Sequence, residues 1–189
     1  MKKPVIFTIG HSTHSIDEFV KLLQAHDVKE IIDVRSIPKS RHNPQFNSDT
    51  LKESLKRVRI KYKHIKRLGG LRHTKKDSLN LGWHNASFRG YADYMASVEF
   101  EAGLAALVKT AGARYTAIMC AEAVPWRCHR SLIADALIKK GWLVRDIMSR
   151  KTAHRHRLTP FLKVRKGQLI YPAPKHAQQS GIDKTIIGC

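Results

Sequence analysis

The chain has 189 residues, of which 42% are hydrophobic and 26% charged, and these values exclude both a disulfide-stapled miniprotein and a disordered polypeptide. Its formal net charge of +20 predicts a polyanionic partner. Three cysteines, no apolar run long enough to cross a bilayer and no secretion signal predict a cytoplasmic protein with reduced thiols and no membrane contact.

The excess positive charge is concentrated in two segments. Residues 35–76 hold 14 basic and 2 acidic residues, and residues 149–176 hold 8 basic and no acidic residues. The rest of the chain carries 13 residues of each sign. We therefore expect nucleic acid or another polyanion to contact these two segments, with a solvated basic surface as the alternative.

The first half of the chain alternates strand and helix patterns. Apolar runs and helical spacing predict, in chain order, a strand over residues 5–9, a helix over 15–26, a strand over 30–35, a helix over 49–58 and a third strand over 60–65. Ser15 and Glu18 have the spacing of a capping box. The first helix is therefore expected to begin at Ser15.

The second half begins with a long polar loop and then resumes the alternation. The elements predicted are the loop over residues 69–87, helices over 88–98 and 101–109, a strand over 115–119, a helix over 125–140 and a strand over 142–147. Pro125 suits the first turn of its helix. Beyond Met148 the pattern weakens into a basic tail with one short strand over 168–171.

Strands that alternate with helices predict a parallel sheet covered on both faces. We therefore expect an α/β fold: an open, mostly parallel sheet with helices on both faces, plus a basic C-terminal tail. The α/β domain that contains the candidate site is predicted over residues 1–150, and the basic C-terminal extension over residues 151–189. In such a sheet, ligands bind at the carboxyl ends of the strands.

Polar residues follow three of the predicted strands at those ends. They are His11 and Ser12 after the first strand, Asp33 and Arg35 at the end of the second, and Cys120 and Glu122 after the strand over 115–119. If these strands are neighbours, all six side chains face one crevice. The two carboxylates either orient arginines by charged hydrogen bonds or act in acid–base catalysis with His11. Magnesium binding by the pair is a third alternative.

The segment from Cys120 to Arg130 is the densest in reactive residues. A strand end, a short loop and a helix start follow one another here, and free amide groups at a helix start bind anions and lower thiol pKa values. Arg35, Arg127, Arg130 and the helix start before Cys128 are predicted to hold phosphate. Ser12, Cys128 and Tyr91 are predicted to lie in the same substrate-binding site. Cys120 or His129 is then expected to assist the chemistry, and Arg130 has a surface pairing with Glu122 as its alternative role.

Cysteine and histidine in this segment are also acceptable zinc ligands. The spacing argues against a metal site, because Cys128 and His129 would point about 100° apart on a helix and no C-x-x-C pair is present. A metal-dependent hydrolase that uses Cys120, Cys128 and a histidine stays an alternative. The other alternative treats both cysteines as small buried hydrophobes.

Several motifs closely resemble those of the domain of unknown function 488 family. They are Ile9-Gly10-His11-Ser12, Asp33-Val34-Arg35 with Pro38 and Ser40, Leu68-Gly69-Gly70, Phe88-Arg89-Gly90-Tyr91, Cys120-Ala121-Glu122 and Cys128-His129-Arg130. The resemblance implies an α/β fold with these motifs, Tyr91 included, around a common site. It implies no reaction beyond a loose association with DNA repair. Asp33-Val34-Arg35 is also faintly similar to the rhodanese domain, which makes sulfur transfer a further alternative.

These observations predict a nucleic-acid-associated enzyme whose cysteine, histidine and arginine side chains form a phosphate-binding site. The substrate is expected to be a nucleic acid or a nucleotide, and no cofactor is identified. A non-catalytic nucleic-acid-binding module and the metal-dependent hydrolase are the alternatives.

Overall fold

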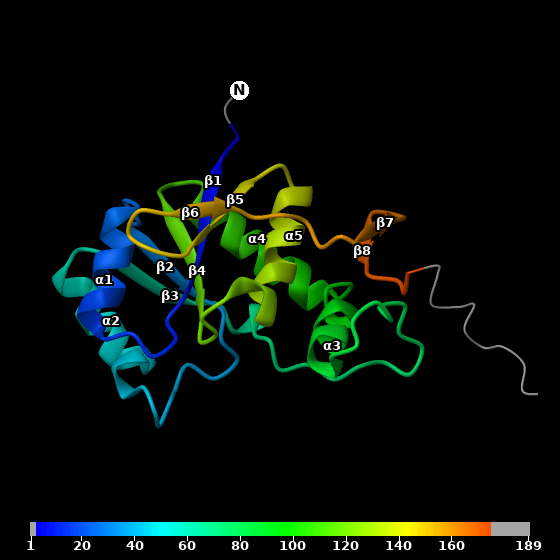
Figure 1. Ribbon diagram of the computed structural model, residues 1–189, viewed down its shortest axis with the longest axis horizontal. Helices are drawn as coiled ribbons and strands as arrows, with labels where there is room; N and C mark the ends of the chain where they lie inside the picture. Colours follow the sequence, from blue (N-terminus) through cyan, green and yellow to red (C-terminus); the bar gives the residue numbers. More distant parts are fainter. Residues whose placement is uncertain (1–2, 175–189) are drawn as a thin grey trace, which may run out of the picture.

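The computed structural model describes residues 3–174, and strands alternate with helices over most of this range (Figure 1). The strands are β1 Val5–Gly10, β2 Glu30–Asp33, β3 Lys61–His64, β4 Thr116–Cys120, β5 Leu143–Ile147, β6 Ala153–Arg155, β7 Lys163–Arg165 and β8 Gln168–Ile170. The α-helices are α1 Ile16–Ala25, α2 Ser48–Arg57, α3 Ala86–Tyr94, α4 Val98–Ala111 and α5 Arg130–Lys139. Short 3-10 helices are η1 Pro44–Phe46, η2 Lys66–Leu68 and η3 Pro125–Arg127.

Six strands form the central sheet in the order β3-β2-β4-β1-β5-β6. The first five pair in parallel, and β6 pairs antiparallel with β5. The predicted α/β fold class is therefore confirmed. Because β4 lies between β1 and β2, the carboxyl ends of these three strands adjoin, and a crevice at such a switch in strand order is where open α/β sheets bind ligands.

Helices cover both faces of the sheet (Figure 1). Phe7 and Ile9 of β1 face one side, where Phe19 of α1 and Leu51 of α2 complete a core. Ile6, on the alternate side of β1, belongs to the core built with α3, α4 and α5. Side chains of a strand alternate between faces, so one short apolar strand supplies both cores.

The predicted capping box at the first helix is confirmed. The backbone N–H of Glu18 donates to the Ser15 hydroxyl, and the Ser15 N–H donates to the Glu18 carboxylate. This cap ends the loop after β1 at a fixed residue. It therefore fixes the length of the His11–His14 segment at the sheet edge.

The prediction of one continuous helix over residues 125–140 is wrong. The chain makes the single turn η3, passes through Cys128 in extended conformation with φ −135° and ψ 143°, and begins α5 only at Arg130. The Cys128 N–H donates to the Pro125 carbonyl and closes the turn. Hydrogen bonds from His129 to the Val34 carbonyl and from Arg130 to the Glu122 carbonyl stabilise this interruption of the helix.

The described part of the C-terminal segment is bound to the sheet and to α5. His156 is buried after β6 and donates from Nδ1 to Asp146 of β5 at 2.8 Å. The predicted strand over 168–171 is present as β8, paired with β7 in a hairpin. Residues 175–189 of the predicted tail lie outside the described residues, and the division of the chain at residue 150 stays a prediction. Within residues 3–174, no helix is both long and apolar enough to span a membrane.

Candidate functional site

A pocket of about 640 Å³ lies at the carboxyl ends of β1, β2 and β4. The pocket is lined by eight of the residues that the sequence predicted for the site: His11, Ser12, Arg35, Cys120, Glu122, Arg127, Cys128 and His129. Asp33, Tyr91 and Arg130 are buried behind this lining. The strand-end residues therefore do meet in one crevice, but three of the predicted site residues support its wall.

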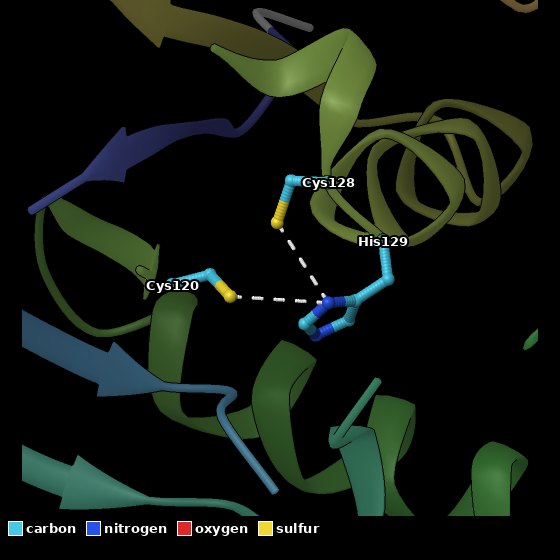
Figure 2. Close-up of side chains that lie close together, drawn as sticks. All are labelled: Cys120, Cys128 and His129. Atoms are coloured by element: carbon cyan, nitrogen blue, oxygen red, sulfur yellow. Dashed lines mark hydrogen bonds between the residues drawn. The ribbon is translucent and has the colours of Figure 1, made fainter. Parts of the chain in front are cut away.

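Three side chains point toward one another at the inner end of the pocket. Figure 2 shows Cys120 at the end of β4, with Cys128 and His129 at the start of α5. The sulfur of Cys120 lies 3.9 Å from Nδ1 of His129, and the sulfur of Cys128 lies 3.7 Å from the same atom. All three donor atoms lie within 4.8 Å of one another.

The imidazole of His129 has a fixed orientation. Its Nε2 lies 2.9 Å from the carbonyl oxygen of Val34, so Nε2 carries the proton and donates. Nδ1 therefore faces both sulfurs; it donates to a thiolate when the ring is charged and offers a lone pair when the ring is neutral. The ring of Tyr91 lies 4.9 Å away from the imidazole, and a Cβ atom at Gly70 would come within 2.5 Å of Nδ1.

The break before α5 explains how two consecutive residues face one point. Cys128 is extended, whereas His129 has helical angles with φ −56° and ψ −13° at the N-cap. The side chains are therefore not separated by the rotation between neighbours in a helix. This corrects the geometric objection that the sequence raised against a shared metal ion.

Burial and hydrogen bonding separate the two thiols in pKa. The hydrogen bond with Cys128 and then burial raise the pKa of the Cys120 thiol well above its usual value. Burial would also raise the pKa of Cys128, but hydrogen bonds from Cys120 and His129, with the charge of Arg130, outweigh it and lower that pKa well below the usual value. Cys128 therefore carries the thiolate of the pair.

A buried ion pair braces the end of β2. The Arg35 guanidinium donates to both oxygens of Asp33 and also to the carbonyl oxygen of Phe46. Tyr62 of β3 donates its hydroxyl to Asp33 at 2.8 Å. The Asp33 carboxylate thus orients Arg35, the simpler of its two predicted roles.

His11 is neutral at physiological pH. Burial, with a smaller contribution from the charge of Arg35, lowers the pKa of His11 to about 4. Its Nδ1 donates to the Ser12 carbonyl at 2.9 Å, which leaves Nε2 to accept from Arg35 at 3.3 Å. The ring also stacks on Phe46. His11 therefore lines the pocket as a fixed acceptor rather than as a cation.

The loop after Cys120 depends on Arg130. This side chain is 1% exposed, and its Nη2 donates to the backbone carbonyls of Glu122 and Ala123. The expected surface pairing with the Glu122 carboxylate is therefore wrong. Since Arg130 holds the loop from beneath, the exposed side chains of Glu122 and Arg127 line the pocket.

Other residues of the pocket lining were not identified as site residues in the sequence. They come from the loop after β2, the start of α3 and the turn after η2: Ser36, Lys39, Ser40, Asn43, Gly70, Ser87 and Phe88. Ser40, Gly70 and Phe88 stand within the motifs quoted for the family resemblance. Ser36, Lys39 and Asn43 lie in the loop after β2 and Ser87 lies at the start of α3, and only the tertiary structure brings them to the strand ends.

Comparison with known families agrees with the motif resemblance. The family model described as "Domain of unknown function DUF488" matches residues 15–137, which include β2, β4 and the start of α5. No curated protein and no solved structure matches the chain. The chain belongs to the DUF488 family, and its matched region contains Cys120, Cys128 and His129.

Proposed function

We propose that this protein is a metal-dependent hydrolase that acts on a nucleic acid or a nucleotide. The observation that carries the proposal is the convergence of the sulfurs of Cys120 and Cys128 and Nδ1 of His129 at the inner end of a polar pocket. Thiolate and imidazole donors so arranged form a metal-ligand set.

The donor distances fit one tetrahedral ion. Zinc–sulfur and zinc–nitrogen bonds of about 2.3 and 2.1 Å place a sulfur and a nitrogen ligand about 3.6 Å apart across a tetrahedral angle. The two sulfur–Nδ1 distances here are 3.9 and 3.7 Å. The second ring nitrogen of His129 donates to a backbone carbonyl, which is the usual outer contact of a metal-bound histidine.

The donor set favours zinc, because two thiolates and one imidazole are soft to borderline ligands. Three protein ligands leave a fourth position, and the pocket provides the space beside it. An ion held by these residues would supply the means to activate water and to polarise the bond to be cut. Both cysteines must stay reduced to act as ligands, which agrees with the expected cytoplasmic location.

Groups around the ligand set suit an anionic substrate. Lys39 and Arg127 are exposed cations in the pocket lining, and Ser12 and Ser40 add hydroxyl groups. Arg35 is already balanced by Asp33, so we assign phosphate contact to the first two. Glu122 places a carboxylate in the same lining, where it can accept a proton from the attacking water.

Metal content and turnover measured together test the proposal. Protein purified without a His tag should contain about one zinc ion per chain and should cleave labelled oligonucleotides or nucleotides in a broad screen. Cys120→Ser and His129→Asn should lose zinc and turnover but keep most of their polynucleotide affinity. His14→Asn is the control, because this partly exposed histidine pairs with Glu18 and does not line the pocket formed by the described residues. Salt-dependent binding without any turnover would contradict the proposal and leave a binding module.

The lowered pKa of Cys128 favours a second candidate, a metal-free enzyme with Cys128 as nucleophile. Such an enzyme would turn over without bound metal and would be inactivated by iodoacetamide at Cys128. The two candidates therefore separate on one measurement: a chelator abolishes turnover of the metal enzyme and leaves the thiol enzyme unaffected.

A further inference from the structure

A second pocket, of about 1190 Å³, lies beside the first. It is bounded by α5, by β5 and β6, and by the segment over residues 156–161 that follows β6. The proposed reaction makes no use of this pocket. Its lining combines two kinds of side chain, aromatic rings and exposed cations.

The aromatic part includes all three tryptophans of the chain. Trp83 and Trp142 form part of the wall, and the ring of Phe161 lies 5.0 Å from Trp83. Trp126 is 64% exposed at the middle of η3, next to the buried Pro125. A large flat ring so exposed contributes little to the core and is available for stacking.

The charged part of the lining is basic. Lys3, Arg155 and Arg157 are exposed along the pocket, and the exposed His154 belongs to the same lining. The one carboxylate in the lining, Asp146, is buried and already accepts from Thr8 and His156. The free charge of this pocket is therefore positive, and it complements a polyanion.

The two pockets share their dividing walls. One wall is η3, from which Arg127 lines the first pocket and Trp126 lines the second. The other wall is a ring pair, in which Phe88 of the first pocket lies 4.6 Å from Trp83 of the second. A ligand that contacts both Trp126 and Arg127 therefore lies in both pockets at once.

We infer that the second pocket binds the unpaired bases of a single-stranded polynucleotide, with a base stacked on Trp126 and phosphates on Arg155 and Arg157. This inference rests on the proposed function, because it identifies the strand held here as the substrate cut in the first pocket. Exposed rings interleaved with cations are the groups that bind single strands. In a duplex the bases already stack on one another, and an acidic peptide offers no base to stack.

Fluorescence anisotropy with full-length protein tests the inference without any turnover. The probes are a labelled thymidine 12-mer with a phosphorothioate backbone, the same strand with abasic sites, and a duplex of equal length. We expect the 12-mer to bind most tightly. Trp126→Ala should weaken its binding about 5- to 150-fold, the range for loss of one base–aromatic stack. Trp126→Phe should restore most of the affinity.

Tyr115→Ala is the matched control, because Tyr115 is also an exposed aromatic residue but lies before β4, outside both pockets. It should bind like the unaltered protein. Equal binding of the abasic strand, tighter binding of the duplex, equal competition by polyglutamate or an unchanged Trp126→Ala affinity would each overturn the inference. Stacking with intact affinity but no cleavage of any strand would instead contradict the proposed function alone.

Discussion

The residues around His129 restrict its imidazole to one position. Val34 fixes its protonated nitrogen, Tyr91 packs against its ring, and Gly70 lies over Nδ1. The close approach of backbone to the imidazole explains why a residue without a Cβ atom stands at position 70. A larger residue there would have to move the ring away from both sulfurs.

We therefore predict that Gly70→Ala weakens zinc binding at least about 10-fold, the lower end of the effect of disturbing a ligand's supporting contacts. Zinc affinity can be measured by competition with a chromophoric chelator. Gly112→Ala is the matched control, since a Cβ atom there meets nothing closer than 3.5 Å. Equal affinities for the two variants would show that the ring position does not set metal binding.

Two arginines of the first pocket should behave in opposite ways. Arg35 is buried and paired with Asp33, whereas Arg127 is exposed. Arg35→Met should lower the free energy of unfolding by about 3–5 kcal/mol, because it strands a buried carboxylate. Arg127→Met should change it by less than about 0.5 kcal/mol and should instead weaken oligonucleotide binding. Urea unfolding and anisotropy measure the two effects, and similar stabilities for both variants would contradict this assignment.

At the scale of elements, much of the sheet could be predicted because each parallel strand is a short apolar run that needs no knowledge of its neighbours. The capping box at Ser15 is likewise a local signal. The meeting of the three strand ends followed from parallel pairing, although the order that makes them neighbours could not be read from the chain.

The start of α5 could not be predicted because it depends on contacts with other parts of the fold. The contact that orients His129 comes from Val34, 95 residues away, and Arg130 is satisfied by a loop rather than by solvent. Strands β6 and β7 were missed because their residues are mostly exposed and basic. Such strands are defined by the partner that they pair with, and their own pattern carries little signal.

The segment after β6 is attached through a buried histidine. Burial alone would lower the pKa of His156, but the carboxylates of Asp135 and Asp146 outweigh it and raise the pKa to about 9. Between about pH 6.5 and pH 9 the folded protein holds a proton that the unfolded chain releases, so stability falls as pH rises through this window. The contribution is complete below pH 6.5.

We predict that the free energy of unfolding falls by up to about 3 kcal/mol as the pH rises from about 6.5 to about 9. His156→Gln should be less stable at pH 6 and should lack this part of the pH dependence. His154→Gln, two residues earlier and exposed, should keep the slope of the unaltered protein. The measurement is urea unfolding at several pH values, and a His156→Gln variant with an unchanged slope would disprove the linkage.

At the scale of the whole molecule, the two basic segments have different surroundings. Lys61 and Lys63 of the first are exposed on β3, an edge strand, where charge also prevents pairing with another chain. Part of the positive charge of that segment is therefore explained by the fold and requires no binding partner. Lys39 from the first segment and Arg155 and Arg157 from the second line the two adjacent pockets, so the charge that faces a ligand is a subset of the total.

The salt dependence of binding distinguishes the cations that line the pockets from the other cations of the chain. For a single strand, each cation that neutralises a phosphate contributes about −0.7 to the slope of log affinity against log salt. Arg155→Gln combined with Arg157→Gln should therefore reduce the steepness of that slope by about 1.4. Lys29→Gln combined with Lys109→Gln removes the same charge outside both pockets, because Lys29 precedes β2, Lys109 lies near the end of α4 and neither lines a pocket. It should leave the slope unchanged.

Anisotropy titrations of the thymidine 12-mer between 50 and 200 mM KCl, about the range over which phosphate contacts are strongly screened, give both slopes. Equal slopes for the two double variants would mean that the strand responds to net charge alone and that the second pocket holds none of its phosphates.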